Sequence, residues 1–263
     1  MIRFPLILAM LCLPAVASGP QDIAFRSGLD GTEQRYVELL PTGFDTARTN
    51  DVVIAFHGHG ADRWQYLREG RDECRAVRDV AAKHGMIVVS PDYRGTTSWM
   101  GPKAEADVVQ IIGELKRRRK VGRVFVAGGS MGGTAALTFA VLHPELVAGV
   151  CSQNGTANLV EYEGFQGAIG ESFGGSKSEV PGEYRKRSAE LWPERLTMPV
   201  AVTTGGKDAV VPAKSVLRLV GKLEQGRHKV LSLHRPEGLH ETNYGDTCAA
   251  MEFVLKEAAG SPP

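Results

Sequence analysis

Six short apolar runs divide the 263-residue chain, and segments with helical periodicity lie between them. The runs are rich in Val and Ile and are bounded by Gly, Pro or Asp, which is typical of strands buried on both faces of a parallel sheet. In segments 108–115 and 216–223, apolar residues recur at the spacing of one helix face. This alternation predicts an α/β fold, with a mostly parallel central sheet and helices on both faces. The apolar runs are 52–56, 86–89, 124–127, 147–151, 200–204 and 230–233.

The first 17 residues have the pattern of a secretory signal peptide. Arg3 supplies a positive charge, residues 4–13 are apolar, and Ala15 and Ala17 form an A-x-A cleavage signature. The apolar stretch is too short to span a bilayer comfortably, and a buried N-terminal strand is the other reading. We therefore expect cleavage after Ala17, a secreted or periplasmic protein, and a single domain over residues 18–263.

Charge and cysteine content exclude several kinds of partner. Without Arg3, 30 basic residues balance 30 acidic ones, so the mature chain has no positive field to attract nucleic acid or an anionic membrane. We expect neither nucleic acid nor a stable membrane anchor as a partner. Cys74, Cys151 and Cys248 allow one disulfide at most, and whether Cys74 pairs with Cys248 stays open. No Cys and His grouping has metal-ligand spacing, and no cofactor is expected.

A glycine-rich turn follows the third apolar run. Residues 128–133 read GGSMGG, directly after a predicted strand and directly before a predicted helix at 134–142. This is the G-x-S-x-G pattern of a nucleophile elbow, in which a sharp strand-to-helix turn exposes a serine hydroxyl. The other reading is a phosphate-binding turn, but neither G-K-[ST] nor the G-x-G-x-x-G spacing is present. The pattern therefore predicts that Ser130 is a nucleophile.

A serine nucleophile needs a base, and the base needs a group that orients it. With an elbow of this kind the chain order is Ser, then Asp or Glu, then His, at the carboxyl ends of strands. Asp208 follows the run 200–204, and His240 lies in the loop after the run 230–233. We therefore expect Asp208 to orient His240, and His240 to act as base. The rival positions are His234 for the base and Glu237, Glu241 and Asp246 for the acid.

Charge develops on the substrate carbonyl oxygen during attack, so backbone donors should lie next to Ser130. We expect one donor to be the N–H of Met131, at the start of the helix. The loop after the first apolar run reads HGHG over 57–60, and its glycines allow close approach of the backbone to a substrate. The N–H of His59 is the expected second donor. A flexible turn or a stray metal site is the alternative reading of this loop.

Taken together, these motifs resemble the α/β-hydrolase superfamily, and within it the esterase and prolyl oligopeptidase-like branch. The resemblance runs from about Arg35 to Ala259 and implies an α/β-hydrolase domain with a Ser–Asp–His triad. Peptidases of this branch carry a large N-terminal β-propeller, for which this chain has no room, so the resemblance implies a stand-alone catalytic domain. Segments 184–188 and 205–212 are also similar to that branch. The main motifs are HGHG at 57–60, PDYRG at 91–95, GGSMGG at 128–133, Asp208 and His240.

The segment 155–196 is too long for a plain connection between two strands. It contains several aromatic residues and predicts a small cap over the site. Some aromatic side chains in this segment and in other loops after strands are candidates for substrate binding, with simple packing as the alternative. The candidates are Trp64, Trp99, Phe173 and Trp192.

The predicted reaction is hydrolysis of a carboxylic ester through an acyl-enzyme on Ser130. The substrate would be a small-molecule ester or an ester linked to a polysaccharide. A serine exopeptidase of the prolyl oligopeptidase-like type is the first alternative. An acyltransferase with the same triad and a non-catalytic binding module are the others. The sequence leaves the oligomeric state open.

Overall fold

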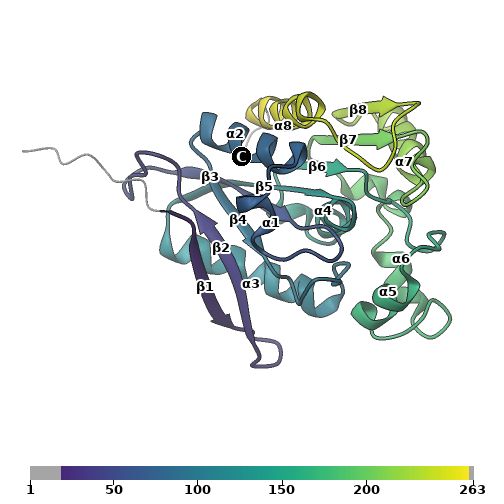
Figure 1. The fold of residues 1–263 in the computed structure, drawn as a ribbon, viewed down its shortest axis with the longest axis horizontal. Coiled ribbons are helices and arrows are strands. Elements are labelled where there is room, and N and C mark those ends of the chain that lie inside the picture. Colours follow the sequence, from purple (N-terminus) through teal and green to yellow (C-terminus); the bar gives the residue numbers. More distant parts are fainter. Residues whose placement is uncertain (1–18, 261–263) are drawn as a thin grey trace, which may run out of the picture.

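The computed structural model describes residues 19–260, and the expected signal peptide lies outside them. One eight-stranded sheet runs through the molecule in the order β1-β2-β4-β3-β5-β6-β7-β8 (Figure 1). The leading hairpin pairs β1 with β2 antiparallel, β2 also pairs antiparallel with β4, and the other five neighbouring pairs are parallel. This confirms the expected mostly parallel sheet. The strands are β1 Gln21–Arg26, β2 Glu33–Leu39, β3 Asn50–Phe56, β4 Ile87–Pro91, β5 Val121–Gly129, β6 Gly149–Gln153, β7 Val200–Gly205 and β8 Val230–Arg235.

Helices cover both faces of the sheet, because the strands are apolar on both sides and each face has to be shielded from water. The helices α2 (Asp72–Lys83) and α8 (Tyr244–Ala259) pack side by side on one face (Figure 1). Their apolar residues share one core cluster with the sheet. On the other face α3 (Pro102–Arg118), α4 (Met131–Leu142) and α7 (Lys214–Gln225) share a second cluster.

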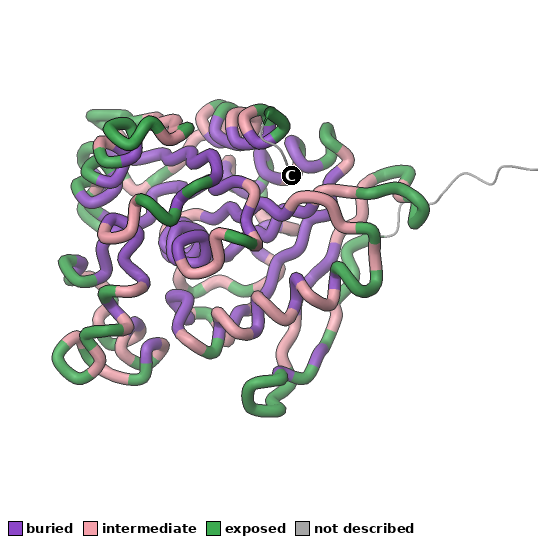
Figure 2. Tube along the Cα trace, turned by 180° about the vertical axis from the view of Figure 1, so that it is seen from behind, coloured by how far each residue is buried: buried purple, intermediate pink, exposed green. Residues whose placement is uncertain are grey.

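Burial follows this layering. Figure 2 shows buried residues along the strands, whereas exposed ones gather at the β1–β2 turn and at the outer edge of the molecule. Within residues 19–260, no helix is both long and apolar enough to cross a lipid bilayer. The cysteines Cys74, Cys151 and Cys248 are all free thiols, so Cys74 and Cys248 do not pair. Burial raises the pKa of Cys74 and of Cys151 to about 12.

Three glycines let the turn between β5 and α4 pack against its neighbours. A β-carbon on Gly132 would lie 2.0 Å from the carbonyl oxygen of Phe56, at the end of β3. One on Gly128 would meet the backbone of Gly132 at 2.4 Å, and one on Gly133 would meet the carbonyl oxygen of Gln153 at 2.7 Å. The glycines of the elbow are therefore required by backbone contacts with both neighbouring strands.

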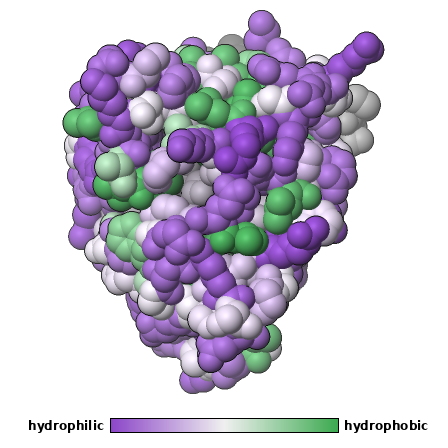
Figure 3. Space-filling view, turned by 90° about the vertical axis from the view of Figure 1, so that its right-hand side faces the viewer, coloured by the Kyte–Doolittle hydropathy of each residue, from purple (hydrophilic) through white to green (hydrophobic). Residues whose placement is uncertain are grey.

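The segment between β6 and β7, which we call the cap (residues 155–196), contains two short helices and two 3₁₀ turns. Its outer surface lies on the side of the molecule seen in Figure 3, which is mostly hydrophilic with separate apolar patches. The buried guanidinium of Arg187 anchors the cap to α3 through an ion pair with Glu105 at 2.6 Å. The elements are α5 Gln166–Phe173, α6 Pro181–Lys186, η2 Ala189–Leu191 and η3 Pro193–Arg195, while α1 (Gln65–Arg68) and η1 (Pro144–Leu146) lie outside the cap.

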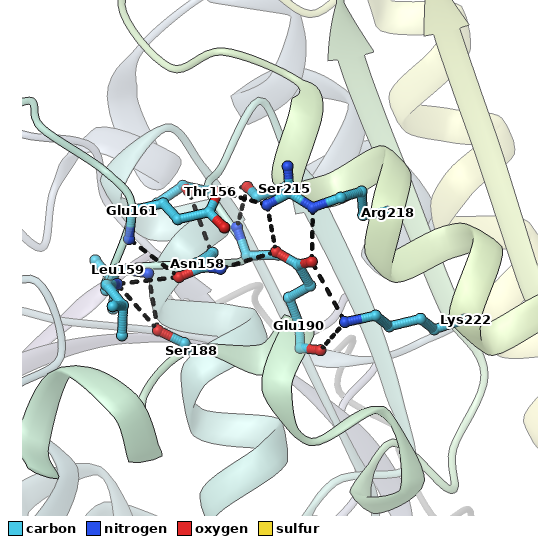
Figure 4. A network of polar contacts seen from close by, with 11 residues as sticks. Thr156, Asn158, Leu159, Glu161, Ser188, Glu190, Ser215, Arg218 and Lys222 are labelled. Carbon is cyan, nitrogen blue, oxygen red and sulfur yellow. Dashed lines mark hydrogen bonds and ion pairs between the residues drawn. The ribbon is translucent and has the colours of Figure 1, made fainter.

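A second anchor joins the cap to α7 (Figure 4). The Glu190 carboxylate, only 5% exposed, accepts hydrogen bonds from Arg218 at 2.7 Å and from Asn158 at 2.9 Å. The Lys222 ammonium donates to the backbone carbonyl of the same glutamate at 3.0 Å. Burial alone would raise the pKa of Glu190, but the hydrogen bonds from Arg218 and Asn158 and the charge of Arg218 together lower it to about 2.

The first prediction concerns the elbow. Gly132→Ala is expected to lower the free energy of unfolding by about 3 kcal/mol, because the added methyl group meets backbone atoms that cannot move aside. Gly221→Ala is the matched control, since it sits inside α7 and nothing lies within 4 Å of the place that an added β-carbon would take. There, alanine should stabilise the protein by about 0.5–1 kcal/mol. Urea unfolding of both variants checks this, and equal stability of the two would contradict the packing argument.

The second prediction concerns the cap anchor. Glu190→Gln should destabilise the protein by about 1–3 kcal/mol at pH 7, because it removes charged hydrogen bonds from a buried position. Since the folded pKa of Glu190 is depressed from 4.5 to about 2, its stabilisation is complete above pH 4.5 and is lost as the pH falls toward 2. The difference between wild type and variant should therefore shrink over that window. Glu161→Gln, at the exposed end of the network, is the control and should change stability by less than about 1 kcal/mol.

Candidate active site

The structure brings Ser130, Asp208 and His240 together at the carboxyl edge of the sheet. Ser130 lies between β5 and α4, Asp208 follows β7, and His240 follows β8. The Nε2 atom of His240 lies 2.9 Å from the hydroxyl oxygen of Ser130, and its Nδ1 atom lies 2.7 Å from a carboxylate oxygen of Asp208. The three side chains form one continuous line of hydrogen bonds. In this geometry the imidazole can accept the serine proton while the carboxylate holds the other ring nitrogen.

The carboxylate of Asp208 is fully buried and is fixed by the backbone. One of its oxygens accepts hydrogen bonds from the N–H groups of Val210 at 2.9 Å and Val211 at 2.8 Å. The other oxygen faces His240. Because both oxygens are engaged, the carboxylate cannot rotate away from the imidazole. The local turn Asp208–Val211 therefore sets the direction of the whole hydrogen-bonded line.

Ser130 has a strained backbone. Its φ is +57° and its ψ is −119°, a conformation that L residues rarely adopt and that costs about 1–3 kcal/mol. The N–H of Ser130 donates to the carbonyl of Gln153 at 2.8 Å, and the carbonyl of Ser130 accepts from Thr134 at 3.0 Å. These bonds and the glycine packing hold the strain in place. The serine hydroxyl is thereby presented to His240.

Asn154 also supports the site, and the sequence interpretation did not include it. It is the first residue after β6, and it has a φ of +48°. Its amide nitrogen lies 3.4 Å from the carboxylate of Asp208 and 3.4 Å from the carbonyl of Leu239, next to His240. Its amide oxygen accepts a hydrogen bond from Thr242 at 2.7 Å. The sequence feature that could have identified Asn154 is its position, because it is a polar residue at the carboxyl end of a buried strand.

A pocket of about 240 Å³ lies beside the serine hydroxyl. His59 and Ser130 both line it, so the HGHG loop and the elbow meet there. Among the described residues, nothing accepts a hydrogen bond from the N–H of His59. Met131 is the first residue of α4, and its N–H has no partner within the helix. His59 thus shares a pocket with Ser130 and Met131 directly follows Ser130, and neither N–H group has a hydrogen-bond partner among the described residues.

The aromatic candidates lie elsewhere. None of the four tryptophan and phenylalanine candidates is among the residues that line the pocket beside Ser130. Trp99 is fully buried, Phe173 lines a different cavity, Trp64 stacks against the Arg68 guanidinium at 3.6 Å, and Trp192 donates to the Arg185 carbonyl at 3.0 Å. Two other aromatic side chains do line the pocket: Phe165, which is 38% exposed, and Tyr66, which is buried. The path of the cap decides which ring reaches the site, and periodicity does not encode that path.

The rival residues have other partners. His234 contacts the Thr204 hydroxyl at 2.9 Å, Glu237 pairs with Lys207, and Asp246 pairs with Arg235. Glu241 lines the pocket, but within the described residues no hydrogen bond or ion pair joins it to the ring of His240, whose partners are Asp208 and Ser130. Within residues 19–260, no group of three or more His, Cys, Asp or Glu side chains could hold a metal ion.

Solved structures similar to this one are α/β-hydrolases with different activities. An acylaminoacyl peptidase from Pyrococcus horikoshii superposes with a TM-score of 0.69 at 16% identity, over 92% of this chain and 42% of that one. Fluorophosphonate-binding serine hydrolase F of Staphylococcus aureus gives 0.70 at 15% identity, over 92% and 99%. A ferulic acid esterase from Anaeromyces mucronatus gives 0.64 at 16% identity, over 91% and 90%. These likenesses confirm the α/β-hydrolase fold.

The chain spans 36–42% of the length of the matched peptidase structures. No curated protein matches the sequence. The model of the prolyl oligopeptidase family, by contrast, matches residues 73–253, which is well over half of the chain and includes the elbow, Asp208 and His240. The chain therefore belongs to the prolyl oligopeptidase family, and it is a serine hydrolase of the esterase and peptidase type with an α/β-hydrolase fold.

Proposed function

We propose that the chain hydrolyses carboxylic esters through an acyl-enzyme on Ser130. The hydrogen-bonded line from Asp208 through His240 to Ser130 is the observation that carries this proposal. His240 takes the serine proton as Ser130 attacks the ester carbonyl, and later returns it to the leaving alcohol. Asp208 holds the ring and stabilises the imidazolium. Water then attacks the acyl-enzyme, with His240 again as base.

The oxyanion that forms in each step is assigned to two backbone donors. One donor is the N–H of Met131, the residue after Ser130 at the start of α4, and the other is the N–H of His59, on the loop after β3 that lines the pocket with Ser130. Donors fixed by the fold need no rearrangement when the charge develops, which is why such groups stabilise a transition state more than water does. No cofactor or metal takes part in these steps as we propose them.

The charges in the pocket favour an ester over a peptide with a free N-terminus. An exopeptidase that binds a substrate ammonium group needs an unpaired carboxylate near the nucleophile. Glu73 lines the pocket, but it pairs with the Arg71 guanidinium at 2.7 Å. Glu241 also lines it, but that carboxylate is exposed, so water weakens its attraction for a substrate ammonium group. An ester substrate needs no such charge.

The exopeptidase remains the second candidate, because the chain belongs to the prolyl oligopeptidase family and superposes on acylaminoacyl peptidases. For the ester substrate, the pocket volume of about 240 Å³ favours a small acyl group. We propose that the alcohol part is a small molecule or a polysaccharide that stays largely outside the pocket. We also propose, from the sequence of the first 17 residues, that the enzyme acts outside the cytoplasm.

Ser130→Ala tests the proposal directly. Turnover of p-nitrophenyl acetate and butyrate should fall by about 10³–10⁶-fold in kcat, because the nucleophile is gone. An aminoacyl p-nitroanilide is measured alongside, and a thermal melt shows whether the variant is folded. Wild-type turnover of the anilide but not of the esters would establish the exopeptidase instead. A folded variant with unchanged ester turnover would overturn the assignment of Ser130.

Asp208→Asn tests how the base is oriented. The amide N–H₂ group would turn toward Nδ1 of His240, so the ring proton would move to Nε2 and the lone pair that faces Ser130 would be lost. We expect kcat for p-nitrophenyl acetate to fall by about 10⁴-fold, with little change in KM. Glu237→Gln is the control, since that rival carboxylate is exposed and pairs with Lys207, and it should keep wild-type kcat. Similar losses in both variants would contradict the assignment of Asp208.

A further inference from the structure

The imidazole of His59, which lines the pocket, packs against two aromatic rings. The indole N–H of Trp99 donates to Nδ1 of His59 at 3.2 Å. The Phe165 ring packs against the same imidazole, with its centroid 4.3 Å from that of the imidazole. Trp99 also packs against Phe165 and Tyr162, at 5.4 Å and 5.7 Å between ring centroids. The loop after β3, the loop after β4 and the cap therefore meet at this one side chain.

The contact with Trp99 fixes the chemical form of the imidazole. An indole N–H can only donate, so Nδ1 of His59 must accept and cannot carry a proton. The ring is then neutral, with its proton on Nε2, since a second proton would set two N–H groups against each other. Burial acts in the same direction, because it lowers the pKa of His59.

The backbone is strained at Trp99, the residue that contacts His59. Trp99 has a φ of +47° and Met100 has a φ of +56°, both in the left-handed region that non-glycine residues rarely occupy. Each such residue costs about 1–3 kcal/mol and persists only where surrounding contacts fix it. Trp99 is nevertheless completely buried. The loop after β4 is therefore strained at Trp99, the residue whose indole N–H contacts the HGHG loop.

The backbone on either side of His59 is pinned as well. The N–H of Gly58 donates to the side chain of Gln65 at 2.7 Å, and the N–H of Gly60 donates to the carbonyl of Thr96 at 2.8 Å. Within the described part of the chain, the N–H of His59 is the one left free between them. The peptide group that carries this free N–H is held through its carbonyl oxygen, that of Gly58, which contacts Nδ1 of His57 at 2.9 Å and accepts from the N–H of Ala61 at 3.2 Å. The peptide groups on both sides and the imidazole are thus also held, while the His59 donor stays available.

We propose that Trp99 and His59 form a positioning pair, in which the indole-to-imidazole hydrogen bond holds the His59 backbone N–H in place for the oxyanion. This inference rests on the proposed ester hydrolysis, and it gives the His59 side chain a role that the backbone assignment alone does not require. The side chain acts through its own peptide group and not on the substrate. Loss of the bond should therefore reduce kcat and leave KM nearly unchanged.

The test compares variants that keep or remove the acceptor. His59→Leu removes it, whereas His59→Asn offers an amide oxygen close to the place of Nδ1. Trp99→Phe keeps a ring and removes the donor. With p-nitrophenyl acetate we expect kcat to fall about 10- to 100-fold in His59→Leu and Trp99→Phe, with KM within about 3-fold of wild type. His59→Asn should retain kcat within about 3-fold. The double variant should be no slower than the slower single one, because both substitutions break the same bond.

Tyr184→Phe is the matched control. It removes a hydroxyl that donates to the Gly175 carbonyl at 3.2 Å inside the cap, and it should keep wild-type kcat. If Trp99→Phe does not fold, the comparison of His59→Leu with His59→Asn decides alone. Folded His59→Leu with wild-type kcat, or His59→Asn as slow as His59→Leu, would overturn the positioning pair. If either of these results is found while Ser130→Ala has lost its ester turnover, the proposed ester hydrolysis still stands and only the positioning pair is overturned. A wild-type enzyme without ester turnover would overturn the proposed function itself.

Discussion

The close approach of backbone to backbone at the turn from β5 to α4 is the constraint on which the site depends. The carbonyl of Phe56 and that of Gln153 both lie where a β-carbon on the adjacent glycines would have to sit. This packing presses the start of α4 against the ends of β3 and β6. It places the loops after these strands around Ser130, and it holds Ser130 in its strained conformation. The hydrogen-bonded line to His240 and the pocket follow from that arrangement.

Buried charged side chains outside the active site hold the cap in position. The cap is joined to α3 by Arg187 and to α7 by Glu190, and both side chains are almost completely buried. A buried charge is costly unless its partners are all in place, so such anchors tolerate few alternative positions of the cap. The partially exposed Phe165 then has a defined place at the pocket, although the segment that carries it has little regular structure.

The sequence predicted the features that depend on local pattern. Apolar runs and the G-x-S-x-G turn located the strands and the elbow, and the rule that reactive groups follow strands selected Asp208 and His240, which the structure brings together. It did not identify Asn154, and it did not single out Phe165 among the aromatic residues of the cap. Asn154 contacts Asp208 only because β6 and β7 are neighbours in the sheet, and Phe165 reaches the pocket through the folding of the cap. Both contacts depend on the tertiary arrangement, which cannot be inferred from the local pattern of apolar residues.

The contact between Phe165 and the His59 ring has a consequence for how this enzyme can diverge. A cap that touched nothing of the reaction centre could be replaced to change the substrate while the chemistry stayed the same. Here a residue of the cap touches the loop that carries one of the proposed oxyanion donors. On the oxyanion role that we propose for His59, a new cap sequence that selects another substrate would also alter the rate of the chemical step. The same proposal implies that substrate selectivity and catalytic rate change together when the cap changes.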